Sequence, residues 1–150
     1  MTRRKKIVLG LILAKTFLLG SSPFLYLSLL FGPNARFVSI DLRPEPTTPG
    51  PKIGGFYAIV DQAPLDPLDR LAVAAALFLG DLSDPILIRA GCFDPRHGLR
   101  LPGFEVAVCV HCLGITRWSV TGESQGGVGP LGGFVWEWVR QRHHLKPPAS

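Results

Sequence analysis

A long apolar run near the amino terminus constrains this chain more than any other feature of its sequence. Residues 7–31 are 25 consecutive residues in which Lys15 is the only charged side chain. As an α-helix rising about 1.5 Å per residue, such a run can cross a bilayer core of about 30 Å. We therefore predict a transmembrane signal anchor over residues 7–31, in which Lys15 snorkels to the basic side or meets a carboxylate of a partner helix.

The charges that flank the run predict its orientation in a membrane. Residues 3–6 are all basic, whereas Arg36 is the one basic residue soon after the run. Because basic flanks stay in the cytoplasm, we expect residues 1–6 to be cytoplasmic and the carboxyl-terminal domain to be extracytoplasmic, in a bacterial periplasm. The alternatives are a signal peptide cleaved near residue 22 or 35, which would make a secreted protein, and a helix buried in a soluble fold.

The positive charge of the chain belongs to its amino-terminal part. The formal net charge is +5 over 150 residues, yet residues 1–40 carry six basic and no acidic side chains, which leaves −1 for residues 41–150. A domain so close to neutral lacks the basic surface that nucleic-acid binding requires. The glycine-rich residues 121–133 contain no lysine, which excludes a Gly-x4-Gly-Lys phosphate loop there. We expect neither a nucleic-acid nor a nucleotide partner.

The remainder of the chain predicts a linker and one small domain. Residues 32–52 contain four prolines between Arg43 and Lys52, which favours an extended Pro-rich linker. Residues 53–145 are interpreted as a small α+β domain, and residues 146–150 as a tail. The expected fold class is therefore α+β, with one amino-terminal transmembrane helix followed by a domain of a β-hairpin or short sheet and one core helix.

Local patterns place the elements of this domain. Asp66 can cap a helix, Pro67 suits its first position, and apolar residues recur at helical spacing as far as residue 79. Residues 134–142 fit a strand and a helix equally well, so their state stays open. β-branched or alternating apolar residues predict strands, the last two joined as a hairpin, at 53–61, 85–90, 104–110 and 115–120; residues 121–133 are predicted to be a loop.

A cluster of cysteine and histidine residues is the candidate site. Cys109 and Cys112 have the Cys-x2-Cys spacing of a metal knuckle, and Cys92 with His97 can complete a tetrahedral zinc site. The alternatives are a disulfide with one unpaired thiol, ordinary buried thiols, and thiol catalysis in which His97 activates Cys92. The cofactor expected is either none or Zn. No catalytic residue is assigned, and an enzyme is the minority interpretation.

The same stretch resembles an uncharacterised prokaryotic membrane-protein family. Residues 92–115 share its order of a Cys, then Pro and Arg, then a Gly leading into Cys-x-x-Cys-x-Gly-Ile. Phe93 stands where the family has His. The family has no established activity, so the resemblance implies only that Cys92, Cys109 and Cys112 act together.

The sequence favours a role in binding over a role in catalysis. We predict a single-pass membrane-anchored accessory, assembly or docking subunit of a membrane protein complex, whose partners are the membrane and other membrane-protein subunits. Candidate contacts are Lys15 in the run and the tryptophans Trp118, Trp136 and Trp138, because tryptophan anchors partners and interfacial lipid. The rival is a small zinc-binding or thiol-active protein that uses Cys92, His97, Cys109 and Cys112.

Overall fold

The structure is a computed structural model that describes residues 6–7, 9–11, 23–41, 50–82, 94–111, 114–129 and 132–146. Over these residues, seven strands form one antiparallel sheet in the order β2-β3-β1-β4-β5-β6-β7. The strands are β1 (Arg36–Asp41), β2 (Lys52–Ile53), β3 (Tyr57–Pro64), β4 (His97–Leu101), β5 (Phe104–Cys109), β6 (Gly114–Ser119) and β7 (Gly122–Gly127).

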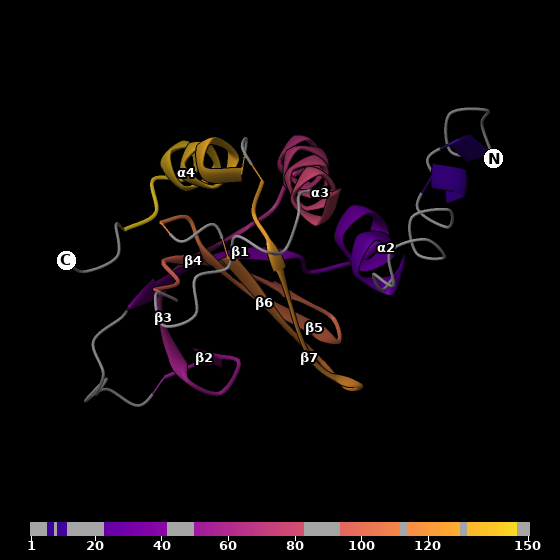
Figure 1. Ribbon diagram of the computed structural model, residues 1–150. Coiled ribbons are helices and arrows are strands. Elements are labelled where there is room, and N and C mark those ends of the chain that lie inside the picture. The colour runs from indigo at the N-terminus through magenta and orange to yellow at the C-terminus, as the bar shows by residue number, and fades with distance from the viewer. Residues whose placement is uncertain are drawn as a thin grey trace.

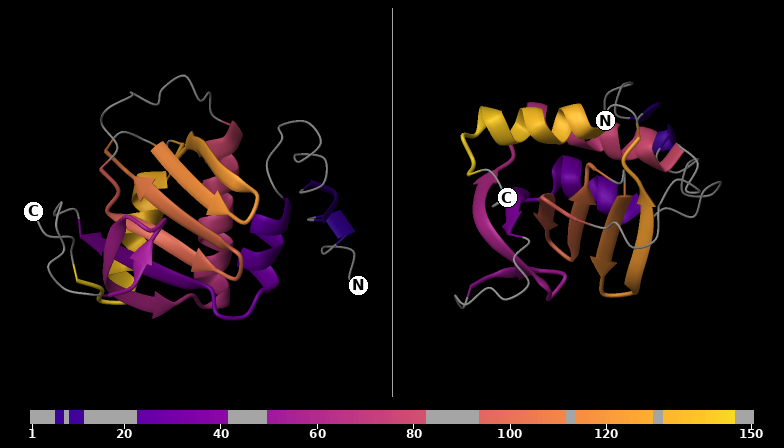
Figure 2. Two further views of the ribbon diagram at one scale, coloured as in Figure 1. Left: turned by 90° about the horizontal axis from the view of Figure 1, so that it is seen from below. Right: turned by 60° about the vertical axis from the view of Figure 1, so that its left-hand side comes forward.

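Within the described residues, the helices that pack on the sheet lie on one side of it, and none packs on the other side. They are α2 (Pro23–Phe31), α3 (Pro67–Leu82) and α4 (Gly132–Arg142), and Figure 1 shows them side by side along one face. The view from below in Figure 2 has the strands in front and α3 and α4 behind them. We call these two sides the helix-covered face and the open face.

The start of α3 has the Asp66 cap that the sequence predicts, and the structure shows the cap to be reciprocal with Asp69. The Asp69 backbone N–H donates to Oδ1 of Asp66 at 2.9 Å, and the Asp66 backbone N–H donates to Oδ2 of Asp69 at 3.2 Å. This arrangement satisfies two N–H groups at the helix start, as a capping box does. The predicted helix is confirmed, and it extends from Pro67 to Leu82.

The main core lies between the sheet and the helices. Alternate strand residues such as Phe37 and Leu99 point to this side, where they meet Leu77 of α3 and Trp136 of α4. The Phe37 ring lies 5.7 Å from the Trp136 ring, centroid to centroid. Trp136 is fully buried, so one of the two tryptophans of α4 packs the helix against the sheet.

A second, smaller core lies on the open face because the sheet curls there. The register of β1 against β3 shifts between Ser39 and Ile40, and a bulge of this kind bends a strand and increases its twist. The turn between β2 and β3 then lies over the middle strands: a Cβ atom on Gly54 would come within 2.6 Å of the Trp118 ring. The cluster consists of Val38, Ile40, Ile53 and Ala107, flanked by Tyr57, Ile59 and Trp118.

The predicted transmembrane anchor over residues 7–31 is wrong for the part of the chain that the structure describes. No helix of those residues is long and apolar enough to cross a bilayer. The end of the run is instead the nine-residue helix α2, whose Leu25, Tyr26 and Leu29 are buried in the core of the domain. The membrane orientation and the periplasmic location, which both rested on the anchor, are corrected with it. Lys15 lies outside the described residues.

The predicted fold class is also wrong, because the sheet is far larger than a hairpin. Residues 36–41, assigned to the Pro-rich linker, form β1 between β3 and β4 in the interior of the sheet. Residues 122–127, predicted to be a loop, form the edge strand β7, and residues 134–142 all belong to α4. The predicted hairpin of β5 and β6 is present. The strand predicted at 85–90 lies outside the described residues.

Candidate functional site: an arginine groove on the open face

A row of polar side chains crosses the open face from β1 to β7. Residues that pair directly across neighbouring strands project to the same face of a sheet. The register pairs Arg36 with Arg100, Arg100 with Glu105, Glu105 with Trp118, and Trp118 with Glu123. Val38, two residues after Arg36, belongs to the open-face core, which places the row on that face. We call these five residues the polar row.

Most of the row is paired internally. Arg100 Nε lies 3.4 Å from Oε1 of Glu105, and the other oxygen of Glu105 accepts the Gly54 backbone N–H at 2.7 Å. At the far end, Trp118 Nε1 donates to Oε2 of Glu123 at 3.1 Å. The carboxylate of Glu105 therefore does two tasks at once: it partners Arg100 and holds the β2–β3 turn over the sheet.

Arg36 stands at the other end of the row without an ion pair among the described residues. Its cross-strand neighbours are Arg100 on β4 and Pro64 on β3, so one side offers a like charge and the other offers no charge. Like charges on directly opposed residues of neighbouring strands destabilise a sheet. Arg36 is thus the charged member of the polar row whose exposed guanidinium has no carboxylate partner among the described residues.

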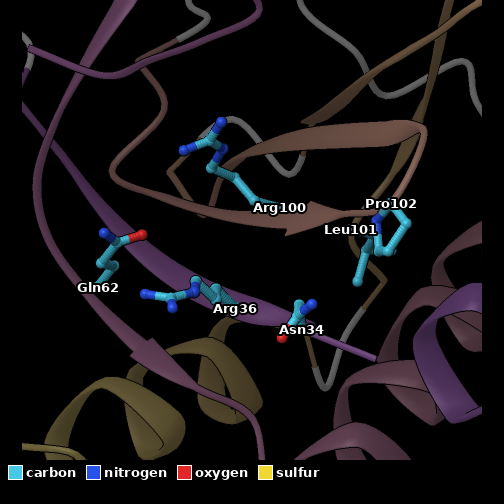
Figure 3. Close-up of a pocket in the computed structure, with 6 residues that line it drawn as sticks. All are labelled: Asn34, Arg36, Gln62, Arg100, Leu101 and Pro102. Atoms are coloured by element: carbon cyan, nitrogen blue, oxygen red, sulfur yellow. The ribbon is translucent and has the colours of Figure 1, made fainter. Parts of the chain in front are cut away.

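A groove of about 450 Å³ opens at this end of the sheet. We call it the arginine groove; Figure 3 shows its lining residues, contributed by three strands and two turns: Asn34, Arg36, Gln62, Arg100, Leu101 and Pro102. Asn34 lies in the turn between α2 and β1 with φ of 60°, a left-handed conformation that asparagine tolerates. Gln62 pairs with Val38, which makes it a diagonal neighbour of Arg36 on the same face.

The lining chemistry suits an anion. Guanidinium groups present several N–H donors in a plane that matches the oxygens of carboxylate or phosphate. The side-chain amides of Asn34 and Gln62 add neutral donors. None of the six lining residues is a nucleophile or an acid or base that titrates near neutral pH. The groove can therefore hold and orient a negatively charged group, and its own residues offer no means of transforming it.

Two further polar networks tie the helices to each other and to the sheet. The fully buried carboxylate of Asp69 accepts from Arg142 at 2.6 Å and lies 2.6 Å from Nε2 of His143, which joins the start of α3 to the end of α4. Asp81 of α3 accepts the Tyr26 hydroxyl at 2.6 Å and pairs with Arg117 of β6. Burial, followed by the charge of Asp81, raises the pKa of Tyr26 and keeps its hydroxyl a donor. Both networks stabilise the packing of the helices on each other and on the sheet.

The structure describes two members of the predicted metal site. His97 is buried on the helix-covered face, with its ring 5.8 Å from that of Phe37, and Nε2 lies 3.8 Å from Glu137. Burial lowers the pKa of His97 to about 4, against the opposing effect of Glu137. His97 pairs with Val108, so the next residue, Cys109, projects to the open face. The backbone thus aims His97 and Cys109 to opposite sides of the sheet.

Cys92 and Cys112 lie outside the described residues, and among the residues described no group of three potential metal ligands gathers at one place. The buried Sγ of Cys109 accepts the Asp94 backbone N–H at 3.4 Å. The zinc site, the disulfide and the thiol interpretations all stay predictions.

The tryptophans predicted as contact residues have three different environments. Trp136 is fully buried. Trp138 is partly buried, and the Arg142 guanidinium lies 5.4 Å from its ring centroid, a cation–π arrangement. Trp118 is partly buried beneath Gly54 on the open face.

The residues of the arginine groove were missed in the sequence. In the sequence, Arg36 is a basic flank of the apolar run, and Arg100 belongs to no recognisable pattern. The one available signal was the alternation of Arg36, Val38 and Ile40 with Phe37, Ser39 and Asp41, which is typical of a strand with two distinct faces.

Comparison with known proteins supplies no relative from which to transfer a function: no family model, no curated protein and no solved structure matches this chain.

Proposed function

We propose that this protein is a non-catalytic docking subunit of a protein assembly, and that it holds an acidic partner in the arginine groove. One observation carries the proposal: Arg36 and Arg100 face each other across β1 and β4, and the one carboxylate paired with either among the described residues is Glu105. An arrangement that costs stability in the isolated domain is expected where a ligand offsets the cost.

The same groove supports binding over catalysis. Acyl or phosphoryl transfer needs a nucleophile, or a base within hydrogen-bond reach of one. The lining residues supply cations, amides and apolar surface instead. The closest approach to a catalytic pair in the described residues is His143 with Asp69, but that carboxylate is also committed to Arg142 and to the Asp66 backbone. Its environment is accounted for by the junction of α3 and α4.

The test is recovery of the partner with and without the groove arginines. Tagged full-length chain is purified from an extract of its source cells, in parallel with Arg36→Gln/Arg100→Gln. We expect a stoichiometric companion protein with the unmodified chain and its loss with the double variant. The control is Lys52→Gln/Arg96→Gln, which removes the same charge outside the groove and is expected to retain the companion. A chain recovered alone, or a companion that the double variant retains, would contradict the proposal.

A further inference from the structure

We infer that the group bound in the arginine groove is a carboxylate, clamped between the guanidinium groups of Arg36 and Arg100. This inference rests on the proposed function and specifies the chemistry of the partner. It means that the partner presents an Asp or Glu side chain, or a free chain end, in preference to a phosphorylated residue.

The polar row lacks a negative charge at its β1 end, beside Arg36. The polar row runs Arg36, Arg100, Glu105, Trp118 and Glu123, so each basic residue could be flanked by an acid except at the β1 end. Arg100 has Glu105 on one side and Arg36 on the other. A negative charge placed at the Arg36 end would give Arg36 an acidic neighbour, as Arg100 already has in Glu105, and opposite charges at neighbouring positions stabilise a sheet.

The net charge of the two arginines and Glu105 also favours a singly charged ligand. Arg36 and Arg100 supply two positive charges, and Glu105 already neutralises one of them at 3.4 Å from Arg100. The remaining charge of +1 matches a singly charged carboxylate. A phosphate group carries about −1.5 to −2 at neutral pH, so it would leave the groove with an excess of negative charge beside the partly buried Glu105.

The neutral donors and the volume of the arginine groove also suit a carboxylate. In Figure 3, Arg36 and Gln62 extend toward each other, while Arg100, whose Nε lies 3.4 Å from Glu105, extends away from them. A carboxylate has two oxygens with about four acceptor positions, which two guanidiniums and an amide can fill together. A volume of about 450 Å³ fits a side chain or chain end with a few flanking atoms.

The experiment is a titration of the full chain followed by NMR, with acetate, acetamide and inorganic phosphate as probes. We expect acetate to shift the Nε–Hε signals of Arg36 and Arg100 in a saturable way, while neutral acetamide leaves them in place. Acetate that moves neither signal overturns the inference. Phosphate that binds more than about tenfold more tightly than acetate, a difference of about 1.4 kcal/mol, overturns the choice of a carboxylate.

Variants test whether the two arginines act together. Arg36→Gln and Arg100→Gln are each expected to weaken acetate binding at least about tenfold, since each removes a charge-assisted hydrogen bond. Lys52→Gln/Arg96→Gln is expected to change acetate binding less than about twofold, because long-range surface charge is screened. Equal weakening by the control pair would show general electrostatic attraction, and it would overturn the groove as the site.

Two synthetic peptides distinguish the source of the carboxylate. One is acetyl-Ala-Ala-Ala with a free carboxyl end, and the other is acetyl-Ala-Glu-Ala with an amidated end. Saturable binding of either supports the inference and names the source; binding of neither contradicts it. If the companion protein is lost with Arg36→Gln/Arg100→Gln but no carboxylate probe binds, the docking function stands and the carboxylate falls. If the probes bind but the companion is retained, the groove stands and the docking function falls.

Discussion

The two faces of the sheet use the same strands for different purposes. On the helix-covered face, 19 buried residues form the main core, whereas the open-face cluster has four buried residues within the described chain. β1 shows the contrast within two positions: Phe37 is buried against Trp136, and Arg36 is exposed in the groove. Burial of apolar area is the dominant favourable contribution to folding, so stability should depend mainly on the covered face. The open face can then tolerate an unfavourable pair of charges.

The largest expected effect is on the covered face. Trp136→Ala removes a fully buried indole between α4 and Phe37 and is expected to lower the free energy of unfolding by about 4 kcal/mol. Phe134→Ala, on the same helix but at a ring that is 73% exposed, is the control and should cost less than about 0.5 kcal/mol. Urea unfolding measures both. Similar losses for the two variants would contradict the assignment of the core to this face.

The next effect is a pH dependence that arises from the same face. The pKa of His97 is about 4 in the folded chain and 6.5 as its ordinary value, so between these values the unfolded chain binds more protons. The free energy of unfolding is therefore unaffected by His97 protonation above pH 6.5, and it decreases by about 3 kcal/mol as the pH falls toward 4.

His97→Gln tests this pH dependence because glutamine does not titrate. Urea unfolding at several pH values is expected to give a flatter profile for the variant between pH 4 and 6.5. Glu137, whose pKa the hydrogen bond from Arg140 lowers to about 2, affects stability at lower pH, below its ordinary value of 4.5. An unchanged slope in the variant between pH 4.5 and 6.5 would show that His97 is not the group responsible.

On the open face, two adjacent glycines separate contact from conformation. Gly54 and Gly55 both have positive φ, at 59° and 76°, but a Cβ atom at Gly54 would meet the Trp118 ring at 2.6 Å and one at Gly55 meets open space. Each alanine substitution should cost about 1 kcal/mol for the left-handed backbone. Gly54→Ala should cost about 2 kcal/mol more, because the ring must move. Equal losses in urea unfolding would mean that the β2–β3 turn does not rest on Trp118.

The smallest effect has the opposite sign. Arg36→Glu places an acid opposite Arg100 and is expected to raise the free energy of unfolding by about 0.5 kcal/mol, because a like pair becomes an opposite pair. Lys52→Glu, on the exposed short strand β2, is the control and should change stability little. If Arg36→Glu destabilises the chain, Arg36 has a favourable role in the isolated fold, and the open face does not carry an unfavourable pair of charges.

Some of this fold could be predicted from neighbouring residues alone. The cap of Asp66 and Asp69 and the helical spacing that follows it specify α3, because helix signals act within one or two turns. The alternation in β5 and β6 likewise predicts a hairpin with a short connection. β7 was missed because its Gly-Glu-Ser-Gln-Gly-Gly sequence has little strand propensity, and its place in the sheet comes from pairing with β6.

The candidate site was hidden for a related reason. Composition assigned the excess positive charge to residues 1–40, and Arg36 is one of its members, but no local rule relates that residue to Arg100. The short spacing of the cysteine and histidine residues predicts that they share one site. In the fold, His97 pairs with Val108 and projects to the same face as that residue. Cys109 follows Val108 along the strand and therefore projects to the opposite face, because successive residues of a strand alternate.

The sequence by itself determined the elements that depend on local spacing and capping, and it determined the near-neutral charge of residues 41–150. Tertiary structure alone decided the fate of the apolar run, whose last nine residues form α2 with Leu25, Tyr26 and Leu29 buried in the domain core. It also brought Arg36 opposite Arg100. The physical reason is the same in both cases: local propensity selects a helix or a strand, whereas burial and strand pairing between distant segments decide which side chains become neighbours.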